Sequence, residues 1–163
     1  MAVYLKNPPR IKVLEALGSI ADERIHLGER GYAKVLSSTG ERSYNVWVEP
    51  DGINVYSDDN GTRYRKYVGY PIIAILMLQG RLPFNEKIAS ALRGIPWKKL
   101  NEKYKNYRIV ENIVKNIAKK KGVDPVEIDL FVKRVLSELE KIRLQLVDKL
   151  PEKTIQRGLE KWF

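Results

Sequence analysis

Hydrophobic and polar positions follow two different periods along the chain, which separates helical from extended segments. Near the N-terminus Ile11, Leu14 and Leu17 recur at helical spacing, so this segment is predicted to be a helix. From Tyr32 onward the period becomes two, which is typical of half-buried strands. The segment between them is polar and glycine-containing, which indicates a turn region.

The two-residue period predicts four strands joined as an antiparallel meander. Each run is rich in Val, Tyr, Trp or Thr and ends at a turn that contains glycine, the pattern of consecutive hairpins. The expected strands span residues 33–38, 42–49, 53–57 and 62–68. Alternation along the second strand places Tyr44, Val46 and Val48 on one face, and Ser43, Asn45 and Trp47 on the other.

The second half of the chain is predicted to be helical. Pro71 suits the first turn of a short helix that is apolar on nearly all sides, and Gly80 suits its C-terminal cap. This helix is therefore expected in the core. Further helices are expected within residues 84–94, 96–106 and 107–122.

A capping signature marks the start of the longest expected helix. Asp124 can cap it, Pro125 suits its first position, and Glu127 completes a capping box. The helix is expected to extend to Leu150, where Pro151 ends it before a short amphipathic tail. Nearly heptad spacing links Ile128, Phe131, Val135, Leu139, Ile142, Leu146 and Leu150. This stripe predicts packing either on the chain's own core or on a second copy in a homodimer.

Together these elements predict an α+β fold: an N-terminal helix, a four-stranded antiparallel β-meander and a helical C-terminal half. Residues 1–82 would hold the first helix, the meander and the buried helix, and residues 83–163 a helical region packed on them. The length of 163 residues favours one compact unit.

The composition excludes several classes of site. Cys is absent, which excludes disulfides, thiol nucleophiles and Cys-ligated zinc and fits a reducing compartment. His26 is the only histidine, so a histidine-rich metal site is not expected. No apolar run approaches the roughly 20 residues of a membrane span, so we expect a cytoplasmic protein without a membrane partner. High charge with little Gln and no Cys is typical of thermophilic proteins.

The positive charge is concentrated in one segment. Residues 93–121 carry a net charge of +8, against +10 for the whole chain. In the helix expected to start near Tyr107, an outer face opposite the apolar stripe holds Arg108, Asn112, Lys115 and Lys119. A concentrated basic segment favours a polyanionic partner, and a solvated basic surface is the alternative.

Aromatic residues lie among the cations just upstream of that helix. Trp97 and Tyr104 are interleaved with Lys98, Lys99 and Lys105. Lysines neutralise phosphates and aromatic rings stack on bases, so this pattern is typical of nucleic-acid binding. The alternative is that the rings anchor the core while the lysines cover the surface.

The expected strand 62–68 is a second candidate surface. Alternation would place Arg63 and Arg65 on one face and Tyr64 and Lys66 on the other. A cationic sheet face with tyrosines could bind single-stranded nucleic acid, whereas an edge strand protected by charge would need no ligand.

Carboxylates cluster at the predicted turns. Asp58, Asp59 and Asn60 lack the spacing of a calcium loop and are interpreted as turn residues. A metal-dependent nuclease built on Asp58 and Asp59 is the third functional alternative. No phosphate-binding glycine loop or nucleophile elbow is present, so no cofactor or resident metal is expected.

The stretch from Tyr32 to Leu78 resembles the SWIM domain in outline, a small meander followed by a helix. The SWIM helix begins with Cys-x-His and aliphatic residues; here the matching segment reads Gly69-Tyr70-Pro71-Ile72-Ile73-Ala74-Ile75-Leu76. The segment Val55-Tyr56-Ser57 lies near the position of the family's Cys-x-Cys pair. All four zinc ligands are missing, so the resemblance implies a zinc-free derivative and a role in DNA binding or protein interaction. The whole chain also resembles small uncharacterised archaeal proteins.

The sequence therefore predicts a non-catalytic nucleic-acid-binding or accessory protein whose basic segment, residues 93–121, contacts phosphates. DNA and RNA are equally compatible with this pattern. A protein-interaction module is the first alternative, including a homodimer through the helix 125–150.

Overall fold

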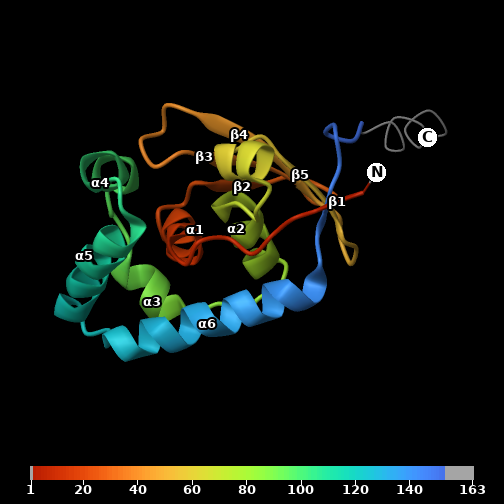
Figure 1. Cartoon of the computed structure of the whole chain (residues 1–163). Coiled ribbons are helices and arrows are strands. Elements are labelled where there is room, and N and C mark those ends of the chain that lie inside the picture. Colours follow the sequence, from red (N-terminus) through yellow and green to blue (C-terminus); the bar gives the residue numbers. More distant parts are fainter. Residues whose placement is uncertain (1, 153–163) are drawn as a thin grey trace.

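The computed structural model describes residues 2–152, which form a six-stranded mixed sheet with α1, α2 and α6 on one side of it (Figure 1). The strand order is β1-β6-β5-β4-β3-β2, and every neighbouring pair is antiparallel except β5 with β6. The strands are β1 (Val3–Tyr4), β2 (Ile25–Leu27), β3 (Tyr32–Leu36), β4 (Ser43–Val48), β5 (Asn54–Ser57) and β6 (Gln145–Leu146). The fold is therefore α+β, as predicted.

The meander is confirmed for three consecutive strands, β3, β4 and β5. Val46 lies opposite Ala33 and Ser57, and Val48 lies opposite Val55, so these side chains share the core face of the sheet. Tyr44 lies on the same face, while Asn45 and Trp47 point to the other, as alternation predicts.

The prediction of a fourth strand at residues 62–68 is wrong. Residues Gly61–Arg65 form a single π-helical turn, η1, and Tyr67 makes only an isolated parallel bridge with Lys6. The cause lies just upstream: the Asp59 carboxylate accepts hydrogen bonds from the Thr62 amide at 3.1 Å and the Thr62 hydroxyl at 2.9 Å. A capped helical turn therefore replaces the hairpin turn that Asn-Gly normally favours.

The helices are α1 (Ile11–Ala21), α2 (Tyr70–Leu78), α3 (Glu86–Ala91), α4 (Trp97–Tyr104), α5 (Tyr107–Lys120) and α6 (Pro125–Ile142). As expected, α2 is buried along nearly its whole length. The buried residues of α1, α2, α3, α5 and α6 and of β3, β4 and β5 form one hydrophobic cluster. No helix among residues 2–152 is long and apolar enough to cross a membrane.

The capping box of α6 is present, but the helix is shorter than predicted. Asp124 accepts from the Val126 amide at 2.9 Å, and the Asp124 amide donates to the Glu127 carboxylate at 3.1 Å. The helix ends at Ile142 because Arg143 adopts a left-handed conformation, with φ of 52°. The chain then enters β6, and the expected tail beyond residue 152 lies outside the described residues.

The apolar stripe of α6 packs on the chain's own core. Ile128, Phe131, Val135 and Leu139 are all buried. A homodimer through α6, which stays a prediction, would have to use its outer face, where Val126 and Leu130 are exposed.

Candidate functional site

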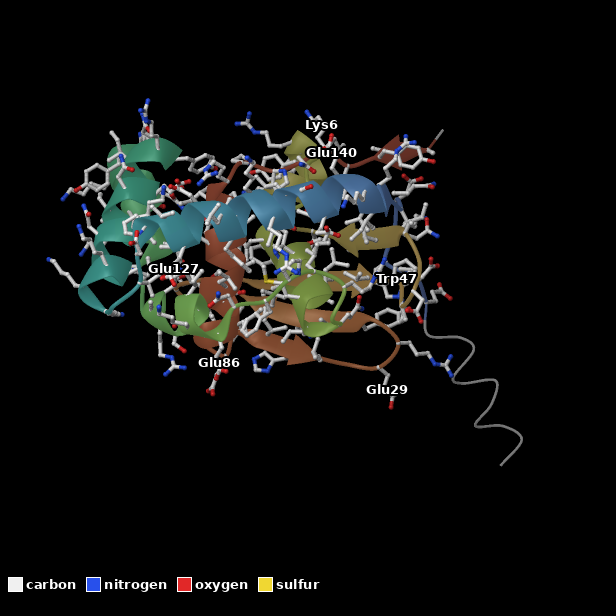
Figure 2. All side chains as sticks on the ribbon, turned by 90° about the horizontal axis from the view of Figure 1, so that it is seen from below. Lys6, Glu29, Trp47, Glu86, Glu127 and Glu140 are labelled. Carbon is white, nitrogen blue, oxygen red and sulfur yellow. The ribbon has the colours of Figure 1, made fainter. Side chains whose placement is uncertain are left out.

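The basic helices α4 and α5 form one end of the molecule, and nitrogen-tipped side chains project from it into solvent, far from the labelled Trp47 (Figure 2). The cations here whose side chains make no ion pair or hydrogen bond within residues 2–152 are Lys99, Lys103, Lys105, Arg108, Lys119 and Lys120. These exposed residues are called the α4–α5 basic surface below. Tyr104 and Tyr107 are exposed beside it, whereas Trp97 is buried as a core anchor.

Two of the residues expected to bind phosphate are neutralised by carboxylates. The Lys98 ammonium lies 3.4 Å from the Glu41 carboxylate and 3.9 Å from that of Glu102. The Lys115 ammonium lies 2.8 Å from Glu111 and 2.6 Å from Asp129. The sequence-predicted basic face of α5 is therefore reduced to Arg108 and Lys119.

The other two candidates, Arg63 and Arg65, lie on η1 instead of a strand. Both are exposed, and the Arg63 guanidinium lies 5.6 Å from the centre of the Tyr64 ring. No sheet face carries them, so the predicted cationic strand surface does not form.

A network of ion pairs joins the segment before α1 to α5 and α6. The Arg10 guanidinium contacts Glu111 at 3.2 Å and Asp129 at 2.7 Å, and Lys115 contacts the same two carboxylates. Burial opposes ionisation of Glu111, but hydrogen bonds from Lys115 and Arg10 outweigh it and lower its pKa. The hydrogen bond from Lys115 likewise lowers the pKa of Asp129. The network therefore stabilises the fold above about pH 4.5, the ordinary pKa of a glutamate.

Replacing Lys115 with methionine is expected to lower the free energy of unfolding at pH 7 by about 2 kcal/mol, because two carboxylates lose a charged donor. A carboxylate with a lowered pKa contributes stability that is lost as pH falls through that pKa. The variant should therefore lose less stability than the wild type between pH 5 and pH 2. Urea unfolding across this pH range measures the free energy of unfolding of both proteins. If the two free energies fell equally with pH, Lys115 would not be the cause of the lowered carboxylate pKa values.

A polar pocket of about 420 Å³ lies between α1, the β3–β4 hairpin and α4. Figure 1 shows this hairpin reaching toward α4 above α1. The lining of the pocket includes two charged side chains of types that are rarely buried: Glu15 is 4% exposed and Arg24 is 8% exposed. Pockets of this size commonly bind small molecules.

Glu15 is held by two neighbours at the base of the pocket. Its carboxylate lies 3.0 Å from the Lys12 ammonium and accepts a hydrogen bond from the Asn101 amide nitrogen at 2.9 Å. Burial favours the neutral form of Lys12, but the charge and hydrogen bond of Glu15, together with Tyr107 and Tyr67, outweigh it and raise the pKa of Lys12 above its ordinary 10.5.

Arg24 crosses the pocket wall toward the sheet and α2. Its Nη1 group donates to the Leu36 carbonyl at 2.7 Å and to the Tyr70 hydroxyl at 3.3 Å. Burial raises the pKa of Tyr70 to about 12, against the opposing effect of Arg24, so Tyr70 stays a neutral phenol near pH 7.

Three buried polar atoms of the pocket residues have no hydrogen-bond partner within the described chain: Arg24 Nε, Trp97 Nε1 and Asn101 Oδ1. The Asp22 carboxylate, the nearest charged partner, lies 3.9 Å from Arg24 Nε, beyond hydrogen-bond distance. Buried polar groups are nearly always satisfied in folded proteins, so three exceptions around one pocket make it a candidate site.

Sequence reasoning did not identify this pocket. One signal was available: Glu15 follows Ile11 by four positions and so lies on the apolar face of α1, where a carboxylate is costly. Arg24 carried no such signal because it falls in a polar segment.

The carboxylates of Asp58 and Asp59 stabilise the turn by accepting hydrogen bonds. Asp58 accepts a hydrogen bond from the Asn45 amide at 2.9 Å, and buried Asp59 caps η1. Among residues 2–152, no cluster of three or more His, Cys, Asp or Glu side chains could hold a metal ion.

The chain matches a known protein family. Residues 5–145 match the family described as Uncharacterised conserved protein UCP014422, and this match covers most of the chain. Searches of the curated proteins and of the solved structures return no match. The chain therefore belongs to this family of uncharacterised conserved proteins.

Proposed function

We propose that the protein binds nucleic acid through the α4–α5 basic surface, without catalysing a reaction. The carrying observation is that the cations of this surface are exposed and lack carboxylate partners in the described chain, in contrast to Lys98 and Lys115. Unpaired cations gain most from phosphates, because binding releases counterions without breaking an existing ion pair.

Exposed aromatic rings support the same function. Tyr104 and Tyr107 are 36% and 42% exposed next to Lys103, Lys105 and Arg108. Rings beside a cationic track can stack on unpaired bases, which favours single-stranded over duplex partners.

A variant with Lys99, Lys105 and Arg108 changed to alanine is expected to bind labelled single-stranded RNA or DNA more weakly. The slope of log affinity against log salt should become less negative by about 2, at roughly 0.7 per lost contact on a single strand. Fluorescence anisotropy across a salt series, with single-stranded DNA, duplex DNA and RNA, measures affinity and slope.

The matched control changes Lys133, Arg134 and Lys141 to alanine. These residues are exposed on α6, outside the α4–α5 basic surface, and their loss removes the same charge. Equal weakening by both variants would mean that net charge alone attracts the polymer, and absence of binding at low salt would refute the function.

A further inference from the structure

We infer that the polar pocket between α1, the β3–β4 hairpin and α4 binds a small phosphate monoester carrying hydroxyl groups, a sugar phosphate or a nucleoside monophosphate. This inference is independent of the nucleic-acid proposal, because it rests on the interior of the pocket and not on the α4–α5 basic surface.

The hairpin supplies hydroxyl groups oriented as donors. The hydroxyl oxygens of Ser37, Ser38 and Thr39 accept hydrogen bonds from the backbone amides of Arg42, Lys98 and Glu41, at 3.1, 3.3 and 3.3 Å respectively. A hydroxyl whose oxygen already accepts keeps its proton for an acceptor. Ser37 and Thr39 lie 3.4 Å apart and can share one proton, so at least two hydroxyls remain able to donate to an anion.

A guanidinium group supplies the positive charge of the anion site. Arg42 lines the pocket, and its side chain makes no ion pair or hydrogen bond within residues 2–152. Arg24, more than nine-tenths buried on the same lining, adds a second positive charge behind it. Guanidinium groups bind phosphate in a forked geometry, so Arg42 and the hairpin hydroxyls offer donors to the terminal oxygens of a phosphate group.

The pocket lining carries four cations, Lys12, Arg24, Arg42 and Lys98, against three carboxylates. Glu15 is paired with Lys12, whereas Glu41 and Glu102 share the single ammonium of Lys98. Arg24 lies 3.9 Å from the Asp22 carboxylate, so Arg42 is the lining cation without an ion pair within the described residues, and its charge favours an anionic ligand.

The remaining lining side chains suit a hydroxylated body. Glu41 and Glu102 share one ammonium, so their carboxylates keep acceptor positions for hydroxyl groups. Tyr44 and Tyr70 add an aromatic wall, with ring centres 6.4 Å apart in an edge-to-face arrangement. Sugar hydroxyls can donate to these carboxylates, and the volume of about 420 Å³ admits a molecule of that size.

Isothermal titration calorimetry with ribose 5-phosphate, adenosine 5′-monophosphate, ribose, adenosine and inorganic phosphate tests this inference. Both phosphate monoesters are expected to bind at least about tenfold more tightly than ribose or adenosine, because the latter lack the charged group. Tighter binding of the nucleotide than of the sugar phosphate would identify the base as part of the ligand, and the reverse order would identify a sugar phosphate.

Two surface-proximal variants keep the test independent of folding. Arg42→Ala and Ser38→Ala should each weaken binding of the phosphate monoesters, Arg42→Ala by about tenfold, because they remove direct donors. The matched control Arg134→Ala on α6 should bind as the wild type does.

Three results would overturn the inference: no binding of either phosphate monoester at about 1 mM, inorganic phosphate binding as tightly as they do, or unchanged affinity in Arg42→Ala. The variant with Lys99, Lys105 and Arg108 changed to alanine should retain this binding. Loss of nucleic-acid binding and loss of pocket binding are therefore distinguishable.

Discussion

Changing Gly69 to alanine is expected to lower the free energy of unfolding by about 3–5 kcal/mol, a large part of the stability of a domain of this size. Gly69 directly precedes α2 and is buried. An added Cβ would overlap the Asp59 Oδ2 atom and lie only 2.6 Å from Thr62 Oγ1. Neither atom belongs to a flexible surface side chain, so the backbone of α2 or of η1 would have to move.

The atoms that would be displaced hold a buried hydrogen-bond network. Asp59 accepts from the Ser57 hydroxyl and from the amide and hydroxyl of Thr62, and Thr62 Oγ1 accepts from the Gly69 amide at 3.1 Å. Separating them leaves a buried carboxylate without its donors, the mechanism behind the largest mutational losses.

Gly40→Ala is the matched control for this experiment. Gly40 has φ of 77°, and nothing lies within 4 Å of a Cβ built there. Its replacement costs only backbone strain, about 1 kcal/mol. Urea unfolding of both variants gives the comparison, and a Gly69→Ala cost no larger than that of Gly40→Ala would contradict the structural role of the network.

The same network explains why the strand predicted from the sequence at residues 62–68 does not form. Alternation of Arg and Tyr at residues 63–67 fits a strand. The Asp59 carboxylate, however, accepts from the Thr62 amide three positions later, and this cap favours a helical turn. The two-residue strands β1 and β6 have no readable period, and they form because the end of α6 brings residue 145 beside β5. The meander and the helices, with longer periodic runs, were predictable.

The candidate sites also differ in how far the sequence could predict them. The basic surface was predictable because its cations are neighbours along the chain. The neutralisation of Lys115 was not, since its partner Asp129 lies on α6 and Arg10, which shares that carboxylate, precedes α1. The pocket joins α1, the β3–β4 hairpin and α4, which lie far apart in sequence, so no local pattern could reveal it.

Replacing Lys12 with methionine is expected to lower the free energy of unfolding at pH 7 by about 3 kcal/mol. The Lys12 and Glu15 side chains are only 14% and 6% exposed, so the methionine variant leaves a buried carboxylate without its counter-charge. The folded-state pKa of Lys12 is raised above the ordinary 10.5, so its contribution is fully present at pH 7 and is lost only as pH rises through that raised pKa.

A double-mutant cycle separates the ion pair from the packing of the Lys12 alkyl chain. The variant with Lys12→Met and Glu15→Gln removes both charges and keeps a side-chain oxygen that can accept from the Asn101 amide. It should recover most of the loss, because no buried charge is left unpaired. Lys141 and Glu138 provide a control pair with the same three-residue spacing, at 3.3 Å, but with side chains 70% and 42% exposed. Lys141→Met should therefore cost less than about 0.5 kcal/mol. Two results would contradict a stabilising role for the buried Lys12–Glu15 pair. One is an equal loss of unfolding free energy in Lys12→Met and Lys141→Met, and the other is additive losses in the double-mutant cycle.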